Sequence, residues 1–249
     1  MHTPKIVSLV ASYNPHNPFV LNTITELKKV GKVVLFTTTE VQLGADDVFL
    51  YDSSVGIDLV YKPREWIYNN MQSGWDYVLY NEDDILIPES SIHHAIKLYQ
   101  TLPSHMVPGF ARYEYLDPTN KRYIDLHSSN SVHRGGASIV KESFAEFEVW
   151  EPWNLHSGNF LFSKSDISNM IENGRFERYY KEFGFQYGFC DQLESAASVL
   201  YYNYTKVLPK DVEEVCCHHQ PNKYINMAHN YGDACGPSKQ DIISEYNNE

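Results

Sequence analysis

The sequence has few cysteines, no excess of positive charge and no long apolar run. Four cysteines in 249 residues are too few for a disulfide framework in a chain of this size. The 20 lysines and arginines are outnumbered by 32 aspartates and glutamates, and the formal charge of −12 argues against nucleic acid as a partner. No stretch approaches the roughly 18 consecutive apolar residues of a membrane-spanning helix, so no membrane span is expected.

The first residues, MHTPKIVSLVAS, lack the basic, apolar and cleavage regions of a signal peptide. A cytoplasmic location is therefore expected. Aromatic residues are plentiful at 14%, with 19 tyrosines, and this content suits either an aromatic core or a cleft in which sugar rings stack.

The first hundred residues alternate apolar, β-branched runs with amphipathic helical segments. Asn17 is placed as an N-cap with Pro18 at the first helical position, and Gly31 is expected to end that helix. This order of elements predicts an α/β fold with a parallel sheet. The predicted strands cover 5–12, 32–39, 48–53 and 75–80, and the predicted helices begin at 18, 62 and 88.

After Pro103 the sequence no longer shows the regular alternation of apolar runs and amphipathic helical segments. Residues 107–127 predict a hairpin whose turn is 117–120. Residues 159–163 predict a strand, Ser165 the start of a helix, and 188–200 a further helix. No repeat or low-complexity linker interrupts the chain, which predicts a single domain over 1–249.

Three consecutive acids end the strand predicted at 75–80, in the stretch YVLYNEDDILIPESS (77–91). Like charges between two apolar runs repel one another and lose hydration, so a cation is expected beside them. Ligands of open α/β sheets bind outside the carboxyl ends of the strands, and carboxylate oxygens suit Mg²⁺ or Mn²⁺. In an extended chain, Glu82 and Asp84 face one side and Asp83 the other. The alternative is an acidic, solvated loop.

Two motifs together resemble the GT-A glycosyltransferases. They are the strand ending in Ala11-Ser12-Tyr13-Asn14 before a helix, and the YNEDD strand end about seventy residues later. The EDD form is similar to that of the N-acetylglucosaminyltransferase I type. The resemblance implies a single GT-A-like α/β domain, with a mostly parallel central sheet flanked by helices. About 1–102 would be the nucleotide-binding half, and about 103–249 the acceptor half and C-terminal tail.

The resemblance also implies roles for the acidic motif. Asp84 would hold Mn²⁺ or Mg²⁺, Asp83 would lie near the ribose, and Glu82 would support the site. The end of the first strand would cradle the base and ribose of the nucleotide-sugar, through Ser12, Tyr13 and Asn14.

A basic residue and two later segments complete the site that the resemblance implies. Arg64 would contact the base or the diphosphate, and its alternative is a solvent-facing helical arginine. HSGNFLFSKSD (156–166) would lie beneath the donor sugar. GFCDQLESAA (188–197) would supply the acceptor-side base, Asp191, with Glu194 in reserve, and the alternative for both is a helix N-terminal acid.

The dense cluster Cys216-Cys217-His218-His219 has three interpretations. Members of the family use a C-terminal histidine as a further metal ligand, and the resemblance gives this role to His218 or His219, of which we favour His218. Only one of two adjacent side chains in an extended segment can reach the ion. A structural zinc site with Cys235 and a packed histidine pair are the alternatives. A tail from Val215 onward is expected to be ordered by contacts with the donor.

The function implied is metal-dependent transfer of a hexosyl or deoxyhexosyl group, with inversion. The donor would be a nucleoside diphosphate sugar, UDP-linked, and the acceptor a glycan hydroxyl. Two alternatives stay open, a nucleotidyltransferase and a non-catalytic module that binds nucleotide or carbohydrate. The nucleotidyltransferase is disfavoured because ASYNPHNPF (11–19) lacks a glycine- and lysine-rich phosphate loop. Four aromatic residues are candidates to line the acceptor cleft or to pack in the core: Tyr113, Tyr115, Trp150 and Trp153.

Overall fold

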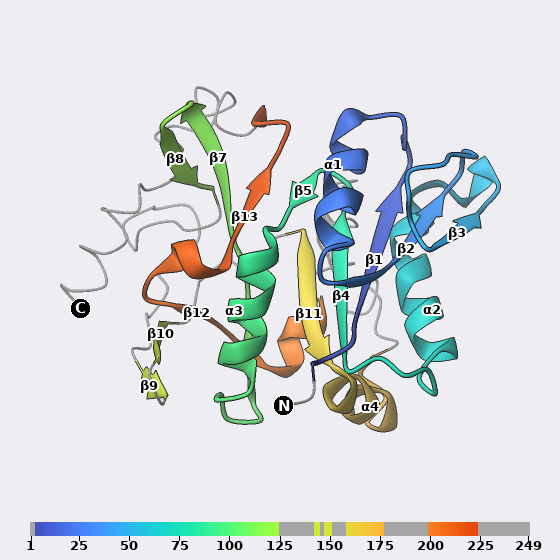
Figure 1. Ribbon diagram of the computed structural model, residues 1–249. Coiled ribbons are helices and arrows are strands. Elements are labelled where there is room, and N and C mark those ends of the chain that lie inside the picture. Colours follow the sequence, from blue (N-terminus) through green and yellow to red (C-terminus); the bar gives the residue numbers. More distant parts are fainter. Residues whose placement is uncertain (1–2, 125–141, 145–146, 151–157, 177–198, 224–249) are drawn as a thin grey trace, which may run out of the picture. The chain divides into compact units, whose positions relative to one another are not determined.

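The computed structural model describes residues 3–124, 142–144, 147–150, 158–176 and 199–223 (Figure 1). Over these residues the protein is α/β, with mixed sheets and four α-helices. The chain divides into two compact units, the first formed by 1–85 and 158–203 and the second by 86–157 and 204–249. The single-domain organisation expected from the sequence stays a prediction.

Unit 1 is built on a five-stranded sheet in the order β11-β4-β1-β2-β3 (Figure 1). The pairs β1–β2, β1–β4 and β2–β3 are parallel, whereas β11 runs antiparallel to β4, so the sheet is mixed. The strands are β1 (Ile6–Ser12), β2 (Gly31–Thr37), β3 (Asp47–Leu50), β4 (Tyr77–Glu82) and β11 (Asn159–Ser163).

The first helix of unit 1 begins where its sequence predicts. In α1 (Pro18–Leu27), the side chain of Asn17 accepts a hydrogen bond from the N–H of Phe19 at 3.1 Å, and Pro18 occupies the first turn. The buried stripe of α1 consists of Val20, Thr23, Ile24 and Leu27. In the described part of the unit, the other helical elements are η1 (Ser53–Tyr61), α2 (Lys62–Asn69), α4 (Lys164–Glu172) and η3 (Val199–Asn203).

Gly31 does not have the role expected of it, which was to end the first helix. The α1 helix has already ended at Leu27, with Lys28 as its C-cap, and Gly31 is the first residue of β2. A Cβ atom at this position would lie 2.2 Å from the backbone oxygen of Ile6 on β1. The glycine therefore permits close contact between two parallel strands and does not terminate the helix.

Two other helix boundaries differ from those predicted. The α2 helix ends at Asn69, earlier than the predicted end before Gly74. The α4 helix begins at Lys164, because the side chain of Ser163, and not that of Ser165, caps it by accepting the N–H of Asp166.

Unit 2 contains the helix α3 (Glu89–Tyr99), the short helix η4 (Val212–Val215) and the strands of two further sheets. The predicted hairpin is confirmed, since β7 and β8 are antiparallel and turn at Asp117–Asn120. One sheet has the order β6-β12-β10-β9, formed by Met106–Pro108, Thr205–Pro209, Phe147–Trp150 and Glu142–Phe144. The other has the order β5-β13-β7-β8, formed by Ile85–Leu86, Cys216–His219, Ala111–Asp117 and Asn120–Tyr123.

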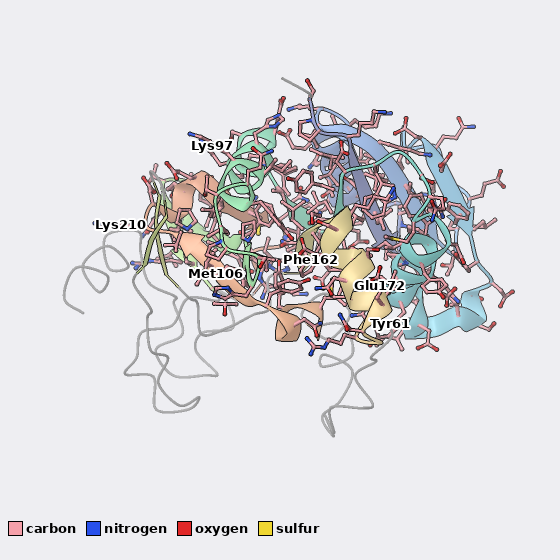
Figure 2. The ribbon with its side chains drawn as sticks, turned by 90° about the horizontal axis from the view of Figure 1, so that it is seen from below. Tyr61, Lys97, Met106, Phe162, Glu172 and Lys210 are labelled. Atoms are coloured by element: carbon pink, nitrogen blue, oxygen red, sulfur yellow. The ribbon has the colours of Figure 1, made fainter. Side chains whose placement is uncertain are left out.

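Each unit buries its own apolar side chains. In unit 1, Phe162 of β11 is fully buried, whereas Glu172 at the end of α4 is exposed (Figure 2). In unit 2, Met106 belongs to a buried cluster with Leu98, Val149 and Val207. None of the helices in the described part of the chain has the length and hydrophobicity needed to cross a bilayer.

Candidate functional site

The three acids lie where two parallel strands of unit 1 end. Ala11 of β1 pairs with Glu82 of β4, so the carboxyl ends of the two strands are neighbours. Glu82 is the last residue of β4, Asp83 and Asp84 form a turn, and the chain resumes as β5 at Ile85. All three acids are half-buried. They are thus held in a turn and are not part of a fully solvated loop.

This turn changes the predicted orientation of the acids. The expectation that Glu82 and Asp84 share one side requires an extended chain, and the extended conformation ends at Glu82. Strict alternation therefore cannot be used to place Asp84. It still applies within β4, where Tyr80 and Glu82 share one face of the sheet.

Ser12 and Asp83 are in direct contact. The Oγ of Ser12 donates a hydrogen bond to Oδ2 of Asp83 at 2.5 Å, and Ser12 is buried at the end of β1. Two residues that the sequence assigns to one nucleotide-sugar site are therefore joined. A hydroxyl donor favours the ionised form of a carboxylate and restricts its rotation.

Gly158 fits closely against Glu82. Its backbone oxygen accepts the N–H of Glu82 at 2.9 Å, immediately before β11 begins. Its φ is +69°, and a Cβ atom would lie 2.8 Å from Oε2 of Glu82 and 3.0 Å from Cγ1 of Ile85. The predicted glycine-containing segment thus reaches the acidic turn, and the close contact explains why a glycine is present.

Tyr13 and Asn14, the next two residues of the predicted site, are exposed. Tyr13 is 41% exposed, and burial of its hydroxyl, helped by the charge of Asp58, raises the pKa of the phenol. The Tyr13 hydroxyl lies 3.8 Å from the point where a Cβ atom on Gly56 would stand. The tyrosine ring thus lies beside η1 with much of its surface accessible to a ligand.

Arg64 is not the solvent-facing arginine that the alternative interpretation describes. It is 4% exposed on α2, and its Cζ lies 5.9 Å from the ring centroid of Phe176. Arg64 also lies close enough to Tyr80 for its positive charge to oppose the rise in that residue's pKa. A buried guanidinium in this position supplies a fixed positive charge near Tyr80 of β4.

Tyr80 was not anticipated by the sequence, because a tyrosine in an apolar strand resembles a core residue. Burial raises the pKa of its hydroxyl well above the ordinary value, and the charges of Glu82 and Asp83 raise it further. The ring stacks on Phe160 of β11, and the buried hydroxyl has no hydrogen-bond partner among the described residues. The hydroxyl therefore stays protonated in the electrostatic field of the acidic turn.

The histidine pair lies in unit 2, on a strand that the sequence did not predict. β13 (Cys216–His219) pairs in parallel with β7 and buries both cysteines. The expectation that the donor orders the segment from Val215 onward stays a prediction. The two histidines have separate partners, as expected of adjacent side chains on a strand. Residues 224–249 lie outside the described residues.

His219 and Glu114 form a buried pair. Nδ1 of His219 and Oε1 of Glu114 share a hydrogen bond, and both residues are almost fully buried. A carboxylate bonded to one ring nitrogen fixes the orientation of the imidazole, as it does for histidines that bind metals or transfer protons. Glu114 carried no signal in the sequence beyond being an acid in a predicted hairpin.

His218 has a different environment. Its Nε2 lies 3.1 Å from Oδ1 of Asn222, and its ring stacks on Tyr113 with centroids 5.1 Å apart. Burial, the main cause, lowers the pKa of His218 below its ordinary value. Tyr115 makes edge contacts with both rings, so Tyr113 and Tyr115 pack within a local aromatic cluster.

The carboxylates at the acidic turn are of the ligand type that Mg²⁺ or Mn²⁺ takes in proteins. Among the described residues, no three histidine, cysteine, aspartate or glutamate side chains are grouped as a metal site. Mg²⁺ at phosphate sites takes only one or two protein carboxylates and completes its coordination with phosphate oxygens and water. The half-buried carboxylates of Glu82, Asp83 and Asp84 are of that kind. His218 belongs to the other unit, and its role as a ligand stays a prediction.

Part of the predicted site lies outside the described residues. Asp191, Glu194, Trp153 and Cys235 fall in this part. The predicted general base and the predicted zinc alternative therefore stay predictions. Comparison of the sequence with protein-family models finds no match, and comparison with curated proteins finds none.

Proposed function

We propose that the chain is a metal-dependent glycosyltransferase of the GT-A type, which transfers a sugar from a UDP-linked donor to a glycan hydroxyl. The observation that carries the proposal is the bond between Ser12 and Asp83, which joins the ends of β1 and β4 beside Glu82 and Asp84. This is the edge of an α/β sheet at which ligands bind. The finer fold assignment, a GT-A domain built on its parallel strands, is part of the same proposal.

The roles proposed for the acids follow from their contacts. Asp83, oriented by Ser12, accepts hydrogen bonds from the ribose. Asp84 would hold Mn²⁺ or Mg²⁺, and the metal would supply positive charge beside the diphosphate leaving group. Glu82, packed against Gly158, adds negative charge and supports the turn. The exposed ring of Tyr13 offers a stacking surface for the base, and Arg64 interacts electrostatically with the donor.

The proposed chemistry needs one proton transfer. As the acceptor oxygen attacks the anomeric carbon, its proton passes to a carboxylate, and the bond from the sugar to the diphosphate breaks. We assign this carboxylate to Asp191, with Glu194 in reserve. Attack from the face opposite the leaving group inverts the anomeric centre.

A donor panel tests the proposal. The full chain is incubated with UDP-, GDP- and dTDP-sugars, with Mn²⁺ and with a chelator, and release of the nucleoside diphosphate is measured. We expect UDP to be released from the UDP-sugars, and only when Mn²⁺ is present. A nucleotidyltransferase would instead produce pyrophosphate from a nucleoside triphosphate and a sugar phosphate. Binding of UDP without turnover of any donor would favour a non-catalytic module.

A further inference from the structure

Thr23 forms an unusual contact for a threonine inside a helix. It is fully buried on α1, and its Oγ1 lies 3.2 Å from the backbone oxygen of Asp83 and 3.1 Å from that of Ile85. Thr25, two residues later on the same helix, donates to the oxygen of Leu21 at 2.7 Å, which is the ordinary i−4 bond of a helical threonine. Thr23 therefore bonds the acidic turn, 60 residues away in the sequence.

Asn81 bonds the same turn from within the sheet. It is fully buried on β4, and its Nδ2 donates to the oxygen of Glu82 at 3.0 Å and to that of Ile85 at 2.7 Å. Together with Thr23, it satisfies the backbone oxygens of Glu82, Asp83 and Ile85. Buried carbonyls in a turn need partners, and here two side chains supply them.

These contacts act against the repulsion between the three acids. Consecutive carboxylates that share a half-buried turn favour a rearrangement that separates them. The backbone of the turn is fixed on both sides of Asp84, through the oxygens of Asp83 and Ile85. Fixing the backbone limits where the Asp83 and Asp84 carboxylates can lie before a cation binds.

We propose that Thr23 and Asn81 are positioning residues, which preorganise the acidic turn for a divalent cation and the diphosphate bound with it. The inference rests on the proposed function, because it assigns the acidic turn to a metal–nucleotide site. Neither side chain touches the ligand. They act through the backbone that carries the acids, as outer-shell partners do around metal ligands.

The test uses three full-length variants and measures the dissociation constant of Mn²⁺ in the presence of UDP, by electron paramagnetic resonance. Thr23→Val keeps the shape of the side chain and removes the donor, and we expect it to weaken Mn²⁺ binding by about 10–100-fold. Thr23→Ser restores the hydroxyl and should restore most of the affinity. Thr25→Val, the matched control, removes a local bond on the exposed part of α1 and should leave the affinity unchanged.

Thermal unfolding of each variant separates positioning from stability. A purely structural role for Thr23 would lower the melting temperature of Thr23→Val without changing the dissociation constant of the folded protein, and this result overturns the inference. Equal affinity in the serine and valine variants also overturns it. If Thr23→Val does not fold, Thr23→Cys replaces it, because a thiol is a weaker hydrogen-bond donor than a hydroxyl. Its affinity for Mn²⁺ should be measurable but lower than that of wild type. An affinity equal to that of wild type overturns the inference.

The wild-type measurement distinguishes the two proposals. If the wild-type chain does not bind Mn²⁺ with UDP at all, the proposed function fails and the positioning role fails with it. If wild type binds and Thr23→Val binds equally well, the metal site stands and only the positioning role is lost.

Discussion

Ser12 and Asp83 are 71 residues apart in the sequence, yet the Oγ of Ser12 donates a hydrogen bond to the Asp83 carboxylate at 2.5 Å. The contact exists because β1 and β4 are adjacent parallel strands whose carboxyl ends meet. A change at the end of one strand therefore alters the carboxylate at the end of the other.

We expect Ser12→Ala to weaken UDP binding in the presence of Mn²⁺ and to lower the free energy of unfolding by about 1–3 kcal/mol, because a hydrogen bond to a charged group is lost. Calorimetric titration and urea denaturation measure the two effects. Ser168→Ala is the control, since Ser168 donates to Glu172 at 3.3 Å on the exposed surface of α4. Equal effects from the two substitutions would mean that the Ser12 contact has no special role.

Gly158→Ala should destabilise the protein more than Gly174→Ala. Both glycines have positive φ, +69° and +63°, so alanine costs roughly 1–2 kcal/mol of backbone strain at either position. Only Gly158 adds a clash, because its Cβ would lie 2.8 Å from Oε2 of Glu82, whereas nothing lies within 4 Å of the same atom on Gly174. Urea denaturation compares the two variants. Equal losses would show that Glu82 moves aside at no cost.

Local signals in the sequence predicted much of the first half of the chain. The apolar runs of β1 and β4 and the Asn17 cap of α1 depend on neighbouring residues alone, and the structure has them as expected. β13 was missed because Cys-Cys-His-His has no apolar alternation. Its burial comes from pairing with β7, about a hundred residues earlier in the chain, which a local pattern does not reveal.

Part of the candidate site could also be predicted from local sequence, and part depends on contacts between distant residues. A strand that ends in three acids is visible in the sequence, and so is a polar strand end at Ser12. The residues that hold the turn, Thr23 and Asn81, are not visible in the sequence. Their role depends on hydrogen bonds to residues of the turn, which the local sequence pattern does not reveal. One signal was present for Thr23, which interrupts the apolar stripe of Val20, Ile24 and Leu27 on α1 and is buried with them. A buried hydroxyl needs a partner outside its own apolar face.

Asp191→Asn should lower the rate of sugar transfer by about 10²–10⁴-fold while donor affinity barely changes, because only the proton acceptor is removed. Steady-state kinetics and calorimetric titration with the UDP-sugar measure the two quantities. Glu194→Gln is the comparison, and it should have the smaller effect on turnover. If donor affinity in Asp191→Asn falls as far as turnover, the residue belongs to the donor site or to the scaffold.

The most direct test of the account is a calorimetric titration of UDP with Mn²⁺ into wild type, Asp84→Asn and Asp47→Asn. Asp47 pairs with Lys32 at 2.6 Å on the surface of unit 1, so its substitution controls for the loss of one acidic charge. We predict that wild type and Asp47→Asn bind UDP only when Mn²⁺ is present, and that Asp84→Asn folds but does not bind it. An unchanged affinity for UDP and Mn²⁺ in Asp84→Asn would contradict the metal site, and the proposed transferase mechanism depends on that site.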